Sequence, residues 1–554
     1  MQHTNGLSEG ILGCFLNHER EIPDDIFLRQ PQGDQWKEYT WNETGDAARK
    51  IAAWLQQQHV EAGSRIGIWS QNCAEWIICD LAIMMSGMVS VPFYANVHPD
   101  MLHSILQHSG CQILFAGKLK PSDWQAAQES IPKNIRVVSF SSYHLSGADS
   151  LDQVAGLPAD EARIVHPRPD DPVTIIYTSG TTGTPKGVVH TYRTTINAVL
   201  AASGMILLNR RGNRFLSYLP LSHAAERGIV EFGGIYSGGS ISFVESTDSF
   251  SRNMKSVLPT HFLGVPRVWH KFKEKITERL PPQQLNRLLK IPVMNSLLRK
   301  RIKAALGLKK AEVILSGAAP ISADLLRWFH RLDINIREGY GLSEDFNACS
   351  LNPPDDIRIG TVGKIFPNQE VKVLPDTYEI VQRASWVMNG YYHNDELNAQ
   401  TLIDGFLHTG DMGSIEDGYL TITGRVKDIF KTTKGEYIVP GAAETVFLSM
   451  DEIDQACVLG SRYPQPFLLV VLSRHGKSLA KPEVERRIGA QLERYNKDCM
   501  DYQKLKKAII VEEEWTPENN LLTPTLKLKR NEIAHKYEEK LEPVFRNDTE
   551  VCWA

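Results

Sequence analysis

The chain has 554 residues, of which 42% are hydrophobic and 23% are charged, a composition typical of a globular protein. This length predicts about three or four structural units rather than one core. The net charge of −4 gives no reason to expect nucleic acid as the main partner.

Two further features concern the cellular compartment. The eight cysteines include no Cys-x-x-Cys pair, which argues against disulfides and zinc and favours a reducing cytoplasm. Residues 1–20 lack a basic end followed by an apolar core, so no signal peptide is expected.

Residues 76–95 approach the length of a membrane span, but Asp80, Gly87 and Pro92 predict a buried helix followed by a strand.

Strand-like and helix-like segments alternate through roughly the first 420 residues. Such alternation predicts an α/β fold with mainly parallel sheets, in which ligands bind at the carboxyl ends of strands. Strands are expected at residues 64–70, 112–116, 136–140, 174–177, 240–245 and 311–316.

The strand at 174–177 is followed by a loop of glycines and hydroxyls that contains one lysine. Glycine lets the backbone approach a ligand, and successive N–H groups can then hold a polyphosphate. The loop is not a Walker loop, because Gly187 follows the lysine. A generic surface loop is the alternative. The candidate phosphate-binding residues are Thr178, Ser179, Gly180, Thr181, Thr182, Gly183 and Lys186.

Residues 177–187 read YTSGTTGTPKG and resemble the phosphate loop of the adenylate-forming superfamily of acyl-CoA synthetases, peptide-synthetase adenylation domains and luciferases. Further motifs follow in the family's order, so the resemblance covers about residue 40 to residue 530. It implies a large N-terminal domain of layered α/β subdomains with a small β-barrel-like part. It also implies a small, mobile C-terminal α/β lid.

Two segments look most like the long-chain fatty acyl-CoA synthetases: residues 219–227 (LPLSHAAER) and 264–269 (GVPRVW). The resemblance implies that His223 lies beside the bound carboxylate and acyl chain. A core histidine bonded to the backbone is the alternative. We find no carboxylate suited to an amino acid's ammonium group, which argues against a peptide-synthetase domain.

A basic stretch extends from Lys271 to Lys310, with twelve Lys or Arg residues against two Asp or Glu residues and with leucines interleaved. A basic amphipathic helix can lie on an anionic membrane, so weak peripheral contact with the cytoplasmic membrane face is one hypothesis. A solvated helix face packed against the core is the favoured interpretation.

Small residues end the strand at 311–316. The turn at 316–320 (SGAAP) resembles the family's adenine-pocket turn, and tight helix–strand packing is the alternative. The resemblance implies adenine contacts from Gly317, Ala318 and Ala319.

Residues 337–344 (REGYGLSE) resemble the family's Tyr-Gly-x-Thr/Ser-Glu motif. Tyr340 offers an aromatic face to adenine beside Gly341, and Ser343 can donate to a phosphate oxygen. Glu344 is a hard oxygen ligand of the type that Mg²⁺ prefers. An ordinary turn is the alternative.

Residues 408–411 (HTGD) resemble the family's ribose motif, which implies that Asp411 binds the sugar hydroxyls. Arg425 is implied at the same sugar and Lys427 at the hinge, while Gly424 replaces the commoner Asp. We expect an N-terminal domain over residues 1–424 and a lid over 425–554. A tight turn at 417–418 between two strands is expected just before this boundary.

Residues 522–530 (LTPTLKLKR) resemble the family's catalytic-lysine motif, which selects Lys527. A lysine on a lid can reach a cleft and neutralise developing charge. A solvated basic tail is the alternative. Leu526 replaces the family's usual glycine, a departure also typical of the long-chain branch.

The resemblance as a whole implies a cytoplasmic AMP-forming acyl-CoA ligase that uses ATP, Mg²⁺, coenzyme A and a fatty, long-chain acid. One alternative is a fatty acyl-AMP ligase or an enzyme that loads a carrier protein. A non-catalytic nucleotide-binding scaffold is a remote one. The oligomeric state is not readable from the sequence.

Overall fold

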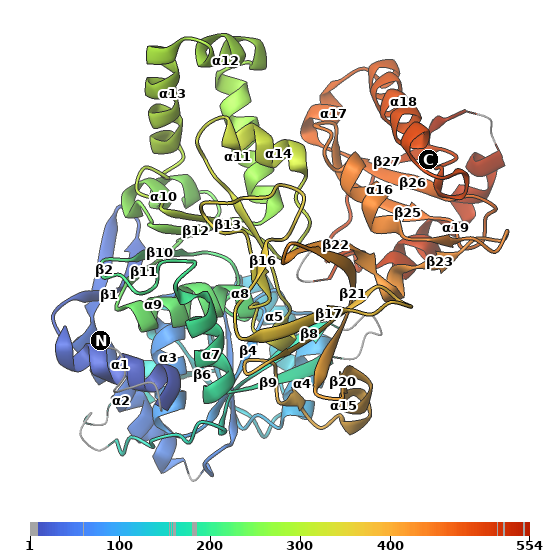
Figure 1. Cartoon of the computed structure of the whole chain (residues 1–554). Helices are drawn as coiled ribbons and strands as arrows, with labels where there is room; N and C mark the ends of the chain where they lie inside the picture. The colour runs from blue at the N-terminus through green and yellow to red at the C-terminus, as the bar shows by residue number, and fades with distance from the viewer. Residues whose placement is uncertain are drawn as a thin grey trace.

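The computed structural model describes residues 9–58, 60–154, 156, 158, 162–179, 185–517, 519–523, 527–546 and 549–554. They form a large N-terminal unit and a smaller C-terminal unit, both mixed α/β, as expected from the sequence. In Figure 1 the smaller unit, coloured orange to red, lies to one side of the larger one. Within these ranges, no helix is both long enough and apolar enough to cross a bilayer.

One sheet of the N-terminal unit has eight strands among the described residues. Its strands from β8 to β7 run parallel, whereas β9 pairs antiparallel with β8 and β19. Every residue of β4 and β5 is buried, as expected for strands covered on both faces. In spatial order the strands are β19 (Gly390–Tyr391), β9 (Pro185–Thr191), β8 (Pro172–Ser179), β4 (Val89–Phe93), β3 (Arg65–Ser70), β5 (Ile113–Gly117), β6 (Arg136–Ser139) and β7 (Asp149–Ser150).

The apolar segment at 76–95 forms a helix followed by a strand, as predicted. The helix is α3 (Ala74–Met85), all of whose residues are buried, and the strand is β4. Asp80 is buried with it and makes an ion pair with Arg227 at 2.6 Å. A paired carboxylate is tolerated in a core where an isolated one is not.

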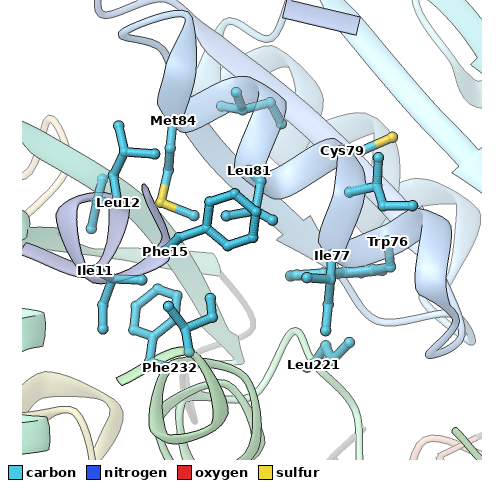
Figure 2. Close-up of a cluster of buried hydrophobic side chains, with 14 of the residues drawn as sticks. Ile11, Leu12, Phe15, Trp76, Ile77, Cys79, Leu81, Met84, Leu221 and Phe232 are labelled. Carbon is cyan, nitrogen blue, oxygen red and sulfur yellow. The ribbon is translucent and has the colours of Figure 1, made fainter. Parts of the chain in front are cut away.

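Helices cover both faces of this sheet, and Figure 2 shows part of the core between them. Phe15 on α1 (Gly10–Glu21), Met84 on α3 and Phe232 in the π-helical turn η5 (Arg227–Phe232) are all buried. The other helices of this region are α2 (Trp41–Gln57), α4 (Pro99–Ser109), α5 (Pro121–Ala127), α6 (Leu151–Val154), α7 (Tyr192–Ser203), α8 (Ala224–Glu226) and α9 (Gly233–Ser237).

A second sheet has fourteen strands among the described residues, and its strands from β14 to β1 run parallel. This half brings the carboxyl ends of β13 and β14 side by side, with Ser316 opposite Glu338. Its strands are β14 (Arg337–Tyr340), β13 (Val313–Ser316), β12 (His261–Leu263), β10 (Arg214–Ser217), β11 (Ser240–Phe243), β1 (Ile26–Gln32) and the antiparallel edge strand β2 (Gln35–Thr40).

Beyond β14 the same sheet continues as antiparallel strands toward the C-terminal unit. The expected barrel-like part is thus an open extension, because no sheet of the described residues closes into a barrel. The tight turn is formed as predicted, with φ of 51° at Asp417 and 78° at Gly418. These strands are β15 (Ser350–Leu351), β16 (Lys364–Ile365), β22 (Tyr419–Arg425), β21 (Phe406–Glu416), β18 (Glu379–Ala384), β17 (Gln369–Val373) and β20 (Leu402–Ile403).

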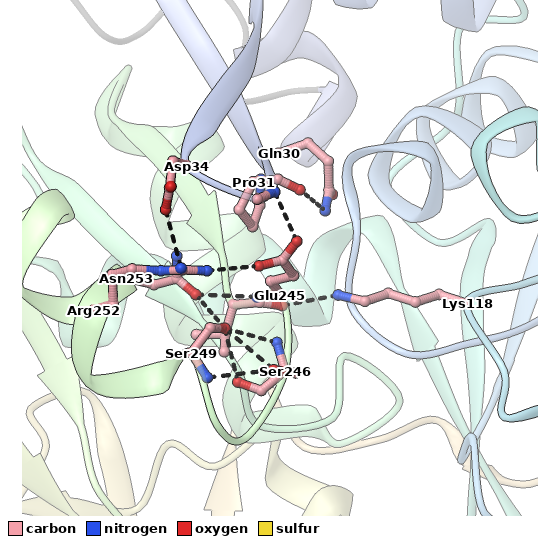
Figure 3. A network of polar contacts seen from close by, with 11 residues as sticks. Gln30, Pro31, Asp34, Lys118, Glu245, Ser246, Ser249, Arg252 and Asn253 are labelled. Carbon is pink, nitrogen blue, oxygen red and sulfur yellow. Dashed lines mark hydrogen bonds and ion pairs between the residues drawn. The ribbon is translucent and has the colours of Figure 1, made fainter.

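A polar network joins the β1–β2 hairpin to the end of β11 and to α10 (Phe250–Val257), as Figure 3 shows. The Arg252 guanidinium pairs with Asp34 and with Glu245, each at 3.0 Å. The Lys118 ammonium donates to the Val244 carbonyl at 2.8 Å. These contacts tie segments of both sheets together.

Four helices follow the second sheet's central strands: α11 (Pro266–Arg279), α12 (Pro282–Leu289), α13 (Pro292–Ala305) and α14 (Ala323–His330). The basic stretch that starts at Lys271 occupies the first three of them. Figure 1 shows α12 and α13 projecting at the top of the N-terminal unit.

The C-terminal unit contains a four-stranded sheet of described residues, with separate apolar clusters on its two faces. The short hairpin β23 (Phe430–Lys431) and β24 (Tyr437–Ile438) precedes it. Its strands are β25 (Ile453–Leu459), β26 (Phe467–Leu472), β27 (Ala508–Val511) and β28 (Val551–Trp553). Its helices are α16 (Pro440–Phe447), α17 (Arg474–Ser478), α18 (Lys481–Asp498) and α19 (Arg530–Arg546).

Candidate active site

Lys186, the lysine of the glycine-rich loop, lies on β9, next to the end of β8 from which the loop begins. β8 and β9 pair antiparallel, with Thr178 opposite Lys186, and Ser179 ends β8. Residues 180–184 lie outside the described residues, so four of the predicted phosphate contacts (Gly180, Thr181, Thr182 and Gly183) have no described position. The Lys186 ammonium lies 5.7 Å from the centre of the Tyr391 ring.

Glu344 follows β14 in the short 3₁₀ turn η6 (Ser343–Asp345). Its carboxylate accepts a hydrogen bond from the Tyr391 hydroxyl at 2.7 Å, and its carbonyl accepts from the Met388 N–H at 2.8 Å. Tyr391 lies on β19, which pairs with β9, so Glu344 and Lys186 are held by neighbouring elements. Sequence reasoning missed Tyr391, because its partner is far away along the chain.

Two neighbours of Glu344 explain the shape of this turn. An ideal Cβ on Gly341 would lie 2.4 Å from the Asn347 backbone, so no larger residue fits there. The buried Asp345 carboxylate accepts from the N–H groups of Leu342 at 2.8 Å and Ala348 at 3.2 Å. Burial raises the pKa of Asp345 to about 7. The sequence motif did not indicate that Asp345 would stabilise this turn through backbone hydrogen bonds.

The predicted adenosine residues meet at the junction of β14, β21 and β22. Asp411 is paired with Arg425 in the β21–β22 register, and the Arg425 Nε donates to Asp411 at 2.7 Å. The second Asp411 oxygen accepts from the Tyr340 hydroxyl at 2.7 Å. These three side chains are connected by hydrogen bonds, so they can contact one ligand together.

The small-residue turn after β13 lies beside this group. An ideal Cβ on Gly317 would be 3.3 Å from the Gly339 carbonyl on β14, and Ala318 has a positive φ of 66°. The Ser316 hydroxyl oxygen is buried without a hydrogen-bond partner among the described residues. Ala318 and Ala319 are exposed. An open turn with an unsatisfied hydroxyl suits a planar polar ligand such as a base.

His223 caps the short helix α8, where its Nδ1 accepts from the Ala225 N–H at 3.1 Å. Burial, together with the charge of Lys527, lowers the pKa of His223 to about 4. The imidazole is therefore neutral near pH 7. A local backbone bond is thus present, as in the alternative interpretation of a core histidine, and the charge of Lys527 also acts on this residue.

Lys527 belongs to the C-terminal unit, and its charge acts on residues of the N-terminal unit. Burial lowers the pKa of its ammonium group, Arg425 lowers it further, and Asp411 and Glu344 raise it. The residue is nevertheless partly accessible to solvent, and the groups that act on its charge are Arg425, Asp411 and Glu344 of the predicted nucleotide site. The Lys527 N–H donates to the Thr523 hydroxyl at 3.0 Å.

The predicted hinge residue Lys427 is exposed in the 3₁₀ turn η7 (Val426–Asp428), directly after β22. Burial lowers the pKa of Lys186, and the charge of Lys427 lowers it further, whereas Glu344 raises it. Lys186 and Lys527, from distant parts of the sequence, are therefore both within electrostatic reach of Glu344, and Lys427 is within reach of Lys186. This concentration of positive charge suits a polyphosphate ligand.

Arg530 is a further residue that the sequence reasoning did not single out. Its guanidinium donates to both oxygens of Glu444 on α16, at 2.5 and 3.1 Å, and to the Val458 carbonyl at 2.7 Å. This bidentate pair anchors the start of α19, three residues after Lys527. The sequence signal that could have identified Arg530 is its position at the end of the lysine motif, residues 522–530.

Comparisons with known proteins agree with this geometry. A family model described as AMP-binding enzyme matches residues 15–392, and one described as AMP-binding enzyme C-terminal domain matches residues 427–549. Long-chain-fatty-acid–CoA ligase FadD15 of Mycobacterium bovis is 28% identical over 98% of this chain and 98% of its own. Long chain acyl-CoA synthetase 2 of Arabidopsis thaliana is 28% identical over 92% of this chain and 87% of its own.

Solved structures share the fold over nearly the whole chain. The anthranilate CoA ligase AuaEII in complex with anthranoyl-AMP has a TM-score of 0.79 at 20% identity, over 97% of this chain and 98% of that one. The o-succinylbenzoate CoA synthetase MenE from Bacillus subtilis, in complex with its acyl-adenylate, has a TM-score of 0.72 at 21% identity, over 94% and 97%. Because the first family model covers more than half of the chain, this protein belongs to the family of AMP-binding enzymes, the adenylate-forming superfamily that its motifs resemble.

Proposed function

We propose that this protein is an AMP-forming ligase that joins a fatty acid, of the long-chain class, to coenzyme A. One observation carries the proposal: Lys527 of the C-terminal unit shares its electrostatic environment with Glu344, Asp411 and Arg425 of the N-terminal unit. The names of the Mycobacterium and Arabidopsis relatives support the substrate class.

The reaction has two steps. First, a carboxylate oxygen of the fatty acid bonds to the α-phosphorus of ATP, the bond from that phosphorus to the bridging oxygen breaks, and pyrophosphate leaves. Second, the thiol of coenzyme A releases its proton to solvent and its sulfur bonds to the acyl carbon. The bond between that carbon and the phosphate oxygen breaks, and AMP leaves. Both steps build negative charge that fixed cations can stabilise.

The phosphates of ATP are held by the glycine-rich loop in this proposal. Thr178, Ser179 and the loop residues 180–183 supply hydroxyl and backbone donors, and Lys186 supplies the charge. Ser343 adds a hydroxyl from the neighbouring turn. This assignment is supported by the pairing of Thr178 with Lys186 and by the proximity of Lys186 to Glu344.

Glu344 is our proposed magnesium ligand. The described residues contain no cluster of three His, Cys, Asp or Glu side chains that could enclose an ion alone. Mg²⁺ is usually bound by one or two carboxylates together with phosphate oxygens, so a single carboxylate fits. When bound, the ion neutralises charge on the phosphates. Tyr391 holds the carboxylate of Glu344 in position.

The nucleoside is held by the small turn at Gly317–Ala318–Ala319, by Tyr340 with Gly341, and by the Asp411–Arg425 pair. In this assignment the Tyr340 ring stacks on adenine, and Asp411 accepts from the ribose hydroxyls. The bond from the Tyr340 hydroxyl to Asp411 supports the assignment, because it fixes the ring relative to the carboxylate.

Lys527 delivers positive charge to the carboxylate and the α-phosphate in the first step. His223 lies beside the acyl group as a neutral imidazole, which can donate or accept one hydrogen bond without adding charge. We further propose that residues 425–554 form a lid that turns about Lys427 between the two steps. The turn removes Lys527 and admits the thiol of coenzyme A.

The function is tested by measuring pyrophosphate release with acids of short, medium and long chain and with an aromatic acid. We expect release with long-chain fatty acids and formation of a thioester when coenzyme A is added. Release without a coenzyme A thioester, but with transfer to an acyl carrier protein, would replace the proposal with a carrier-loading enzyme. Absence of any fatty-acid-dependent release would contradict ligase function.

A further inference from the structure

The hairpin formed by α12 and α13 is anchored to the N-terminal unit by its inner face only. Leu285 on α12 and Ile302 on α13 are buried in an apolar cluster with Phe272 of α11 and Phe329 of α14. The outer face and the tip of the hairpin do not take part in that cluster. Figure 1 shows that this hairpin projects away from the body of the unit.

The tip of the hairpin is apolar and exposed. Its large hydrophobic side chains are Ile291 (47% exposed), Val293 (80%), Met294 (41%) and Leu297 (46%). They fall within seven consecutive residues at the start of α13. We call these four residues the apolar tip. Exposed apolar side chains are ordinary when scattered, but a group of them marks an interaction surface.

The sequence around the apolar tip is rich in Lys and Arg and contains no acidic residues. Between Arg279 and Lys310 there are nine Lys or Arg residues and no Asp or Glu. Among the described residues, Lys303 pairs with Asp333 at 2.6 Å, but no ion pair involves Lys290, Arg299 or Lys300. An unneutralised cationic face attracts an anionic partner.

A pocket of about 480 Å³ lies at the hairpin and collects part of this charge. Its lining residues are Asn286, Leu289, Lys290, Arg299 and Arg331. The Arg299 Nε is buried without a hydrogen-bond partner among the described residues, and Arg331 donates to Asn286. Guanidinium and ammonium donors that converge on one hollow suit a phosphate group.

The order of side chains along α13 matches the layers of a membrane surface. Val293, Leu297 and Lys300 are spaced by four and three residues, so they lie on one helix face. Lys300 follows Leu297 by about 4.5 Å along the axis. Such a face sets apolar groups into the acyl boundary and cations at the phosphates, with the stems of Lys and Arg bridging the two.

We propose that the α12–α13 hairpin docks this protein on an anionic lipid bilayer. The apolar tip enters the interface, the surrounding cations contact the headgroup layer, and the pocket at Arg299 takes one lipid phosphate. The proposal rests on the hairpin alone and is independent of the ligase assignment. Charge complementarity selects a lipid surface, because an apolar protein partner would leave the cations unpaired.

The test is co-sedimentation of the full chain with vesicles. Vesicles of phosphatidylcholine alone are compared with an equal mixture of phosphatidylcholine and phosphatidylglycerol, at about 0.1 M and about 0.5 M salt. We expect binding to the anionic vesicles only, and much weaker binding at the higher salt. Equal binding to both vesicle types, or none to either, would overturn the proposal.

Variants locate the contact on the hairpin. Val293→Gln with Leu297→Gln changes the apolar tip, and Lys290→Gln with Arg299→Gln changes the cationic pocket. Each pair should lower the partition coefficient at least about ten-fold. Each cation near an anionic surface contributes about five-fold, and each apolar side chain that leaves water contributes at least as much. The control pair, Met500→Gln with Lys477→Gln, replaces an exposed apolar and an exposed cationic residue of the C-terminal unit and should bind like the parent protein.

Two further readouts separate folding defects and self-association from membrane binding. Circular dichroism spectra of all variants should match the parent, because Val293 and Leu297 are exposed. If both hairpin variants bound the anionic vesicles as well as the control pair, the proposal would be wrong. It would also be wrong if the parent protein did not bind vesicles but formed a concentration-dependent dimer that the tip variant abolished.

Discussion

Lys273 on α11 donates to Asp451 in the C-terminal unit at 2.6 Å, across the boundary between the two units. Arg267 on the same helix pairs with Glu514 at 2.9 Å and lies 3.8 Å from Asp454. These contacts join the basic helix to the unit that carries Lys527. They therefore help to hold the C-terminal unit against α11 in the arrangement on which the proposed role of Lys527 depends.

The first prediction concerns these ion pairs. Lys273→Gln with Arg267→Gln should slow adenylate formation a few-fold at low salt and leave the thioester step unchanged. The effect is small because partly exposed ion pairs contribute about 0–1 kcal/mol each. Single-turnover rates of adenylate formation and of thioester formation measure the two effects. Arg210→Gln, which breaks a pair with Glu312 within the N-terminal unit, is the matched control. Equal slowing of both steps would argue against a lid contact.

The second prediction concerns Tyr391, whose hydroxyl donates to Glu344 at 2.7 Å. Tyr391→Phe keeps the ring beside Lys186 but removes the donor that positions the carboxylate. The Mg²⁺ concentration needed for half-maximal adenylation should rise about ten-fold, because a hydrogen bond to a charged group contributes about 1.5–3 kcal/mol. An unchanged Mg²⁺ requirement with a reduced maximal rate would place Glu344 outside the metal site.

The third prediction concerns the buried pair between Arg530 and Glu444. Arg530→Gln leaves the Glu444 carboxylate without its main partner and should destabilise the C-terminal unit by about 3–5 kcal/mol. Urea unfolding monitored by hydrogen exchange in β25 and β26 measures this loss. The double change Arg530→Met with Glu444→Leu should recover most of the stability. A double variant as unstable as the single one would contradict the explanation.

These residues also show what the sequence could and could not predict. The succession of helix α3 and strand β4 and the turn at Asp417 follow from local signals, because apolar runs, Gly, Pro and Asp act on their immediate neighbours. The contact between Tyr391 and Glu344 joins residues far apart in sequence, and no local pattern encodes it.

The candidate site divides in the same way. The motifs identified Tyr340, Asp411 and Arg425 one by one, and their hydrogen bonds then appear in the structure as a connected group. The ion pair between Lys273 and Asp451 depends on how the two units pack, so composition could show only that the helix is basic. Residues 180–183, the core of the predicted phosphate loop, stay a sequence prediction because they lie outside the described residues.

The fourth prediction concerns pH. Burial raises the pKa of the Glu226 carboxyl from 4.5 to about 8. The folded protein binds this proton more tightly than the unfolded chain does. The contribution to stability is therefore fully present below about pH 4.5 and is lost as the pH rises through about 8.

Glu226→Gln removes this titration but keeps an oxygen that can accept from the Tyr218 N–H, as Glu226 does at 2.9 Å. Relative to the parent, the variant's free energy of unfolding should increase between about pH 4.5 and about pH 8, by a few kcal/mol in order of magnitude. Chemical denaturation at several pH values measures the difference. A difference that does not vary with pH would show that Glu226 keeps its charge when buried.

The proposed role of Lys527 is tested by the Lys527→Ala variant, with Lys529→Ala as a matched control close to it in the sequence. Two rates are measured: pyrophosphate release from ATP and fatty acid, and thioester formation from coenzyme A and preformed acyl-adenylate. We expect Lys527→Ala to slow the first by about 10²-fold or more and to spare the second, because the lysine's charge is needed where the phosphate reacts. Equal loss in both steps, or normal pyrophosphate release, would contradict the assignment of Lys527 to the nucleotide site.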